Sequence, residues 1–174
     1  MSNLLVQNIK HTNGTTAATI SSGGAFSSPG HVVQTSFHSF TTATTLNSNS
    51  DADVGGSSHT FTPKFASSLL ILSYSVAVQL VRSNTFQGGT INFVVDDSLI
   101  QSASADYEVY LGLSSGSINN YLRVDKEVSM SASNTNAKTV KLMGRPYDTS
   151  DTGYILVNNS ALYRSSIKIQ EIAQ

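Results

Sequence analysis

Cysteine and tryptophan are absent from this chain of 174 residues, and charged residues make up only 12% of it. Without cysteine the chain has no disulfides, no thiolate catalysis and no cysteine-ligated zinc. Lys and Arg number 10 against 11 Asp and Glu, which gives a formal net charge of −1. No basic stripe is present to neutralise phosphates, so we expect no nucleic-acid partner.

Long apolar runs are also missing. No stretch reaches 18 apolar residues, so we expect no insertion into a membrane. The first residues, MSNLLVQNIKHTNG, contain no basic segment followed by an apolar one, and we expect no secretory signal. Ser, Thr, Asn and Gln take the place of the missing charge, so the surface depends on hydroxyls and amides for its solubility.

Residues 67–82 are the most informative segment, because apolar and small polar residues alternate there. Side chains alternate across a strand with period 2, so the segment predicts a long strand with one buried face. The other parity carries small side chains, among them Ser73, Ser75 and Ala77. The buried parity consists of Leu70, Leu72, Tyr74, Val76, Val78 and Leu80.

Strands separated by turn residues recur along the chain, and no segment has a sustained apolar stripe with a period of 3.6 residues. This pattern predicts an all-β fold, an antiparallel jelly-roll β-sandwich, over residues 31–174. Residues 1–30 form a separate N-terminal anchor segment and linker, and residues 47–58 a polar loop. The expected strands of the sandwich are 32–46, 59–65, 67–82, 90–95, 98–102, 107–113, 121–130, 138–143, 153–157 and 163–172.

Within residues 1–30, Asn13-Gly14 between two β-prone segments is a strong hairpin signal. A lone hairpin is marginally stable in water. We therefore expect this anchor arm to pack on its own domain, on a symmetry mate or on a larger assembly. The apolar residues expected to make that contact are Leu4, Val6, Ile9 and Ile20.

Metal-binding patterns are weak. The histidines lack HExxH or HxH spacing, and the acidic loops lack the final glutamate of an EF-hand. We interpret both sets as polar strand, loop or turn residues, with Asp96 and Asp97 serving a turn. These histidines and loop acids are His11, His31, His38, His59, Asp51, Asp53, Asp148 and Asp151.

Catalytic patterns are equally sparse, since there is no GxSxG and no glycine-rich phosphate loop. Glu108, Asp125 and Glu127 fall on expected strands, and nothing selects a pair of them for sugar hydrolysis. We expect no enzyme activity and no cofactor.

Aromatic residues divide by position in the pattern. Those near loops are Phe86, Tyr121 and Tyr147. Contact with a glycan or a protein is one interpretation of these three residues, and chance exposure is the simpler one. Those expected in the core are Phe37, Phe61, Tyr74, Phe93, Tyr107, Tyr154 and Tyr163.

Two parts of the chain resemble a known family. The opening LLVQNIKHTNGTTAATISSGG is similar to the short N-terminal segment of tail-fibre and virion structural proteins of marine and freshwater tailed phages, including cyanophages. PGHVVQTSFHSFTTATT, HTFTPKFASSLLILSYSV and SSIKIQEIAQ resemble their C-terminal jelly-roll domain, in which a TITPKxxxSKILI strand and an IxxxEIA tail recur. Residues 61–64, 69–72 and 171–173 occupy those places.

The resemblance implies a homotrimeric virion structural protein of a tailed bacteriophage, without a cofactor, made in the host cytoplasm and carried on the capsid or tail. Its anchor arm would dock on the major capsid protein or on a tail or portal-adaptor protein. The expected trimer interface is the face that carries Ser73, Ser75 and Ala77, because small side chains let a neighbouring subunit approach closely, or else an apolar strip at strand ends.

The absence of a long shaft favours a capsid decoration, that is, a cement protein, head fibre or short spike. The alternative is a receptor-binding tail fibre or adhesin that recognises a host surface glycan, because a jelly roll supports both roles.

Overall fold

Strands are the only regular elements in the part of the chain that the computed structural model describes, which confirms the all-β expectation. In that part, no helix is long and apolar enough to cross a membrane. The described residues are 8–14, 16–20, 26–100, 109–113, 116–150, 152–160 and 163–174. The strands are β1 (Asn8–Lys10), β2 (Thr16–Ile20), β3 (Phe26–Ser27), β4 (Val32–Phe40), β5 (Thr44–Leu46), β6 (Ala52–Asp53), β7 (His59–Phe61), β8 (Leu69–Arg82), β9 (Phe86–Val95), β10 (Ser98–Ile100), β11 (Val109–Gly112), β12 (Ile118–Ser131), β13 (Lys138–Pro146), β14 (Tyr154–Val157) and β15 (Ser165–Ile172).

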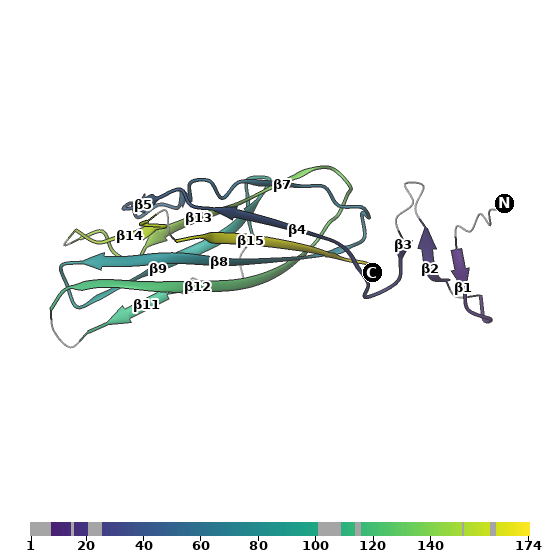
Figure 1. Ribbon diagram of the computed structural model, residues 1–174, viewed down its shortest axis with the longest axis horizontal. Helices are drawn as coiled ribbons and strands as arrows, with labels where there is room; N and C mark the ends of the chain where they lie inside the picture. The colour runs from purple at the N-terminus through teal and green to yellow at the C-terminus, as the bar shows by residue number, and fades with distance from the viewer. Residues whose placement is uncertain are drawn as a thin grey trace.

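Two antiparallel sheets form the body of the molecule (Figure 1). In the first sheet β8 lies between β12 and β15, and β15 lies between β8 and β4. Along the C-terminal part of β8, the neighbouring strand is β14 in place of β15, and β5 lies beyond β14 in place of β4. In the second sheet β9 lies between β13 and the pair β10 and β11, and β6 and β7 lie on the far side of β13. The orders β4-β15-β8-β12 and β7-β13-β9-β11 are those of a jelly roll, so the expected fold class is confirmed.

The core lies between these two sheets and is built on the alternation of β8. Leu72, Val76 and Leu80 are 0% exposed, and they face Ile91 and other apolar residues of the second sheet. The expected buried parity of this strand is therefore confirmed. Tyr74 belongs to the same face, and its buried hydroxyl donates a hydrogen bond of 2.6 Å to the carbonyl oxygen of Ile91, as a buried phenol requires.

The first strand of the sandwich differs from the expectation in two ways. A single strand over residues 32–46 is wrong, because β4 ends at Phe40 and β5 pairs with β14. The placement of Phe37 in the core is also wrong, since its side chain is 65% exposed. The inner side of β4 instead carries polar groups that bond across the sandwich edge, such as the Ser36 hydroxyl, 2.7 Å from Nε2 of His59. Because these bonds turn the polar residues of β4 inward, the residues that alternate with them, including Phe37, point outward.

Residues 47–58 are more than a polar loop. They include β6, which pairs with β13, and Val54 and Ser57 are buried. The Ser57 hydroxyl donates to the carbonyl oxygen of Val54 at 2.7 Å, and its oxygen accepts from the backbone N–H of Leu142 at 3.0 Å. These bonds hold the segment against the second sheet.

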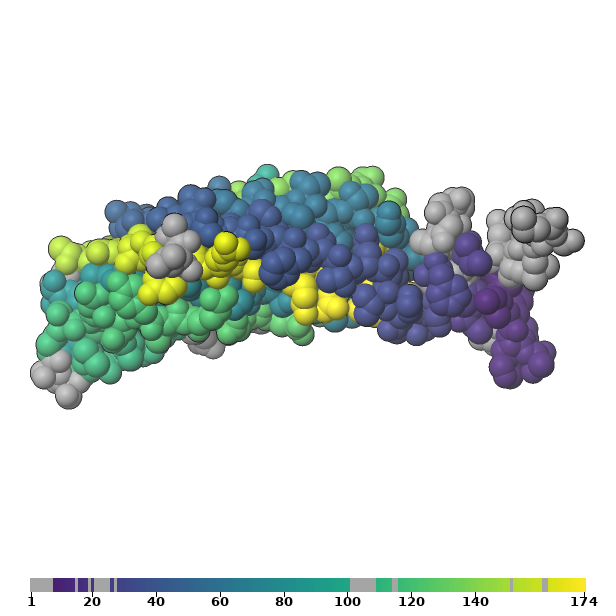
Figure 2. All heavy atoms as spheres, viewed as in Figure 1, coloured from purple at the N-terminus to yellow at the C-terminus, as the bar shows by residue number. Residues whose placement is uncertain are grey.

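The N-terminal strands form a small separate sheet in the order β1-β2-β3. It lies beyond the end of the sandwich near the C-terminus, as the purple atoms at one end of the molecule show (Figures 1 and 2). The expected hairpin is confirmed, with Gly14 at a φ of 85° in its turn, and β3 is an additional strand. The arm joins the sandwich where Gly30 N–H donates to Ala173 O at 2.8 Å and Ala173 N–H donates to His31 O at 2.9 Å.

Candidate functional site

The expected interface residues Ser73, Ser75 and Ala77 lie on the outer face of β8, and each is half-buried. β12 pairs with all three residues on one side, and β15 pairs with Ser73 and Ser75 on the other. A shallow depression of about 560 Å³ lies over Ser73 and Ser75, with Ser166 of β15 also in its lining. These two of the small side chains expected at an interface therefore lie in a concave part of the outer face.

Arg123 bonds to one of the residues that line this depression. Its Nε donates to the Ser75 hydroxyl oxygen at 2.6 Å, and its Nη2 donates to the carbonyl oxygen of Arg164 at 3.1 Å. The side chain therefore extends from β12 across β8 to the segment before β15. The Arg123 side chain therefore holds this part of the outer face in a fixed arrangement, because it bonds to groups on both neighbouring segments.

The anchor arm exposes apolar side chains. Of the expected contact residues, Leu4 and Val6 lie outside the described residues, Ile9 on β1 is 49% exposed and Ile20 on β2 is half-buried. Phe26 on β3 is 45% exposed and was not expected to take part. The small sheet therefore has an apolar surface with exposed Ile and Phe side chains.

One aromatic pair lies toward the end of the sandwich away from the arm. Tyr121 and Tyr163 are 54% and 41% exposed, and their ring centroids are 5.9 Å apart. Asn159 Nδ2 donates to the Tyr121 hydroxyl at 3.1 Å and to Gln79 Oε1 at 2.5 Å. The expectation that Tyr163 lies in the core is therefore wrong; Phe61, Tyr74 and Phe93 are buried as expected.

A second aromatic cluster lies at the same end and consists of Phe86, Tyr110 and Tyr147. Tyr110 is 58% exposed, and Tyr147 is exposed as well. Sequence reasoning placed Phe86 and Tyr147 near loops but did not single out Tyr110. The remaining expected core aromatics are Tyr154, which is half-buried, and Tyr107, which lies outside the described residues.

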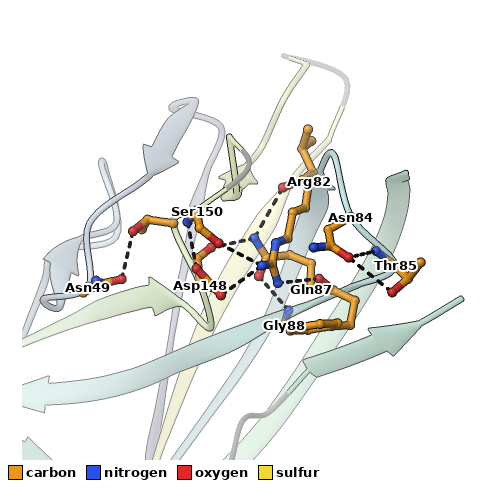
Figure 3. Close-up of polar contacts among 11 residues, drawn as sticks. Asn49, Arg82, Asn84, Thr85, Gln87, Gly88, Asp148 and Ser150 are labelled. Carbon is orange, nitrogen blue, oxygen red and sulfur yellow. Dashed lines mark hydrogen bonds and ion pairs between the residues drawn. The ribbon is translucent and has the colours of Figure 1, made fainter. Parts of the chain in front are cut away.

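The buried cation of Arg82 supports this end of the molecule (Figure 3). Its Nη2 donates to Asp148 Oδ2 and to the Ser150 hydroxyl oxygen, both at 2.9 Å, and its Nη1 donates to Phe86 O at 3.0 Å. Its guanidinium carbon lies 4.3 Å from the centre of the Phe86 ring, within the range of a cation–π contact. Hydrogen bonds from the Ser150 backbone and hydroxyl, together with the Arg82 charge, lower the pKa of Asp148. The arrangement is structural, because both Nη atoms of the buried guanidinium bond to groups of the protein.

Metal-ligand geometry is absent from the described residues, where no group of three or more His, Asp or Glu side chains could hold an ion. Asp51 and Asp53 pair with cations of the chain, at 3.8 Å from Arg145 Nε and 3.0 Å from Lys141 Nζ respectively. Asp151 lies outside the described residues.

Two of the histidines come together in space. The rings of His38 and His59 stack with centroids 5.0 Å apart, and His38 Nε2 lies 2.8 Å from Gly56 O. Burial, with repulsion from His38, lowers the pKa of His59. His11, in the turn between β1 and β2, and His31, just before β4, are exposed. The histidine pair closes the edge of the sandwich between β4 and β7.

The remaining acidic candidates are dispersed. Asp125 and Glu127 project from the outer face of β12 and are exposed, and Glu108 lies outside the described residues. Asp96 and Asp97 form the β9–β10 turn, with φ of 49° and 60°, as expected. Asp96 Oδ1 accepts from Thr139 N–H at 2.8 Å.

Comparisons with known proteins add the following. No protein-family model matches the chain, and no curated protein matches it. A structure described as that of the infectious bursal disease virus Gx strain has 8% identity over 84% of this chain, with a TM-score of 0.35. A crystal structure of the infectious bursal disease virus VP2 subviral particle has 13% identity over 86% of it, with a TM-score of 0.29. The chain spans 40% of the length of each of those chains, and the jelly-roll assignment rests on its own strand order.

Proposed function

We propose that the chain is a non-enzymatic virion structural protein of a tailed bacteriophage, a homotrimeric decoration, head fibre or short spike. The observation that carries this proposal is the anchor arm. A jelly roll with a complete core carries a separate small sheet that leaves Ile9 and Phe26 exposed. The arm is a two-stranded hairpin with a two-residue third strand, and an isolated hairpin is marginally stable in water, so in this proposal the arm is stabilised by a docking surface.

The partner of the arm, in this proposal, is the major capsid protein or a tail or portal-adaptor protein. The arm leaves the sandwich beside Ala173, so docking at that end directs the opposite end outward (Figure 1). The resemblance of the first residues and of the TPK and EIA motifs to phage virion proteins supports the same role.

Deletion of residues 1–28 tests the proposal. The truncated protein is expected to keep its fold and its oligomeric state and to be lost from purified particles. Ile9→Asp with Phe26→Ser should have the same effect without shortening the chain, while Leu99→Ser, at an exposed position of the second sheet, should incorporate normally. Normal incorporation of the truncated protein would contradict the proposal. Hundreds of copies per particle would indicate the capsid, and a few to eighteen the tail.

A receptor-binding role is the second candidate, and the exposed tyrosines favour it. Tyr110, Tyr121, Tyr147 and Tyr163 lie at the end of the sandwich away from the arm, among amide and hydroxyl groups. Tyrosine offers an apolar ring with a polar edge, and such residues are enriched at interfaces. A neutral glycan of the host surface fits this chemistry.

Binding of the purified protein to host cells or to lipopolysaccharide separates the two roles. A receptor-binding role predicts saturable binding that Tyr121→Ala with Tyr163→Ala reduces at least tenfold and that Phe26→Ser leaves unchanged. No binding, together with particles that lose capsid stability when the protein is absent, supports the structural role.

A further inference from the structure

The outer face of the β4-β15-β8-β12 sheet has two unlike halves. On one rung of the sheet, Ser73 of β8 lies between Lys168 of β15 and Glu127 of β12, and Phe37 of β4 lies beyond Lys168. On the next rung Asp125 lies beside Ser75. The β4 and β15 half therefore offers an aromatic ring and a cation, and the β12 half offers two carboxylates next to Arg123, whose guanidinium already bonds to Ser75 and Arg164.

The depression over the serines separates these halves, and the aromatic ring, the Lys168 cation, the two carboxylates and both serines all line it. In the described part of the chain, no ion pair joins Lys168 to Asp125 or Glu127, because β8 lies between them. Within one subunit, the opposite charges therefore stand on either side of a hollow without meeting.

Phe37 is the most exposed large apolar side chain among the described residues, at 65%. A Phe side chain buries roughly 150–250 Å² at an interface, and interface energy is concentrated where an aromatic residue enters a pocket. The small serines leave room for such a side chain beside the carboxylates.

We infer that this face is covered by a second copy of the chain, with Phe37 and Lys168 of one copy against the depression and the Asp125–Glu127 edge of the next. Opposite charges then meet between copies, which fixes the register of the contact. Because the halves are unlike, each copy can offer one half to one neighbour and the other half to the next, and such a heterologous arrangement forms a ring where its rotation closes. The inference rests on the proposed homotrimer and names the residues that would hold it together.

The test measures the mass of the purified full chain by light scattering during size-exclusion chromatography, with circular dichroism to verify folding. The wild-type protein is expected at three times the 18.5 kDa of one chain. Phe37→Ser, Lys168→Glu and the pair Asp125→Lys with Glu127→Lys should each raise the dissociation constant at least a hundredfold. Leu99→Ser and Lys64→Glu are the matched controls, because both side chains are exposed elsewhere, and both should leave the mass unchanged.

The charge-swapped chain is the decisive variant, because it carries Lys168→Glu, Asp125→Lys and Glu127→Lys together. Restoration of the wild-type mass in this variant supports direct pairing between the two halves. A wild-type trimer that all the variants preserve overturns the inference and leaves the proposed trimer standing. A wild-type protein that stays monomeric at high concentration overturns both, and a dimer that the swap restores supports the contact while overturning threefold assembly.

Discussion

The carboxylate of Glu171 accepts a hydrogen bond of 2.7 Å from the hydroxyl of Ser68, 103 positions earlier in the chain. The same carboxylate accepts the backbone N–H groups of Lys64 and Phe65 at 2.9 Å and Nε2 of Gln34 at 2.7 Å. Glu171 is 0% exposed, so these donors take the place of water around its carboxylate. The TPK motif and the EIA motif, which are far apart in sequence, are thus two parts of one buried hydrogen-bonded cluster.

Glu171→Ala is expected to lower the free energy of unfolding by about 3 kcal/mol or more, because it leaves several buried donors without an acceptor. Glu171→Gln should cost less, since its amide oxygen still accepts. Gln170→Ala, at the half-buried outward position next to it, is the control and should cost less than about 1 kcal/mol. Urea unfolding followed by circular dichroism measures all three. Equal stability of Glu171→Ala and Gln170→Ala would contradict this account.

The stability of the sandwich edge should depend on pH through His59. Its pKa in the folded protein lies below the ordinary value of 6.5, because burial and the neighbouring His38 disfavour the charged ring. As the pH falls below 6.5, the unfolded chain therefore binds a proton here before the folded chain does, and stability decreases.

Thermal unfolding at about pH 7.5 and about pH 5.5 measures this dependence, in a range where His titrates and most carboxylates do not. The fall in Tm on acidification should be smaller in His59→Gln than in the wild type. His11→Gln, at an exposed position in the arm turn, should keep the wild-type dependence. The same fall in all three proteins would show that His59 is not the group responsible.

Gly89 should not tolerate a side chain. A Cβ atom at this position would overlap Cδ1 of Ile155 and the carbonyl oxygen of Arg145. Gly89→Ala is therefore expected to lower the free energy of unfolding by about 2–3 kcal/mol, as overpacking does. Gly112→Ala is the control on neighbouring β11, because the nearest atom to its Cβ would be 3.9 Å away. Urea unfolding of the two variants should differ by most of that amount, and equal stability would contradict the prediction.

Sequence periodicity predicted the central strand well and the edge strand poorly, for a physical reason. β8 has neighbours on both sides and one face fully in the core, so its apolar parity is also its buried parity. On β4 the inner face carries Gln34, Ser36 and His38. Their polar groups bond to Glu171, to His59 of β7 and to the carbonyl oxygen of Gly56 respectively. A rule based on hydrophobicity assigns such a face to solvent, and Phe37 is then placed inside.

The candidate surfaces could likewise be predicted only in part from the sequence. The outward position of Ser73 and Ser75 follows from the parity of one strand. The cross-strand neighbours Lys168 and Glu127 could not be deduced, because they depend on pairing between segments distant in the chain. The proximity of Tyr121 and Tyr163 is a product of the same long-range pairing.

Arg82 is expected to hold the loops at the end of the sandwich away from the arm. Arg82→Met fills a similar volume but removes hydrogen bonds to Asp148, Ser150 and Phe86 O, so we expect a loss of about 2 kcal/mol in the free energy of unfolding. Arg82→Lys keeps the charge but lacks the planar fork of donors, and its stability should be intermediate.

Arg145→Met is the control for Arg82, because the Arg145 side chain is 40% exposed and its nitrogen lies 3.8 Å from Asp51. An exposed pair of that kind contributes less than about 1 kcal/mol. Urea unfolding should therefore order the proteins as wild type and Arg145→Met, then Arg82→Lys, then Arg82→Met. If Arg82→Met is as stable as Arg145→Met, the buried guanidinium does not support these loops, and their shape must come from the packing of Phe86, Tyr110 and Tyr147 alone.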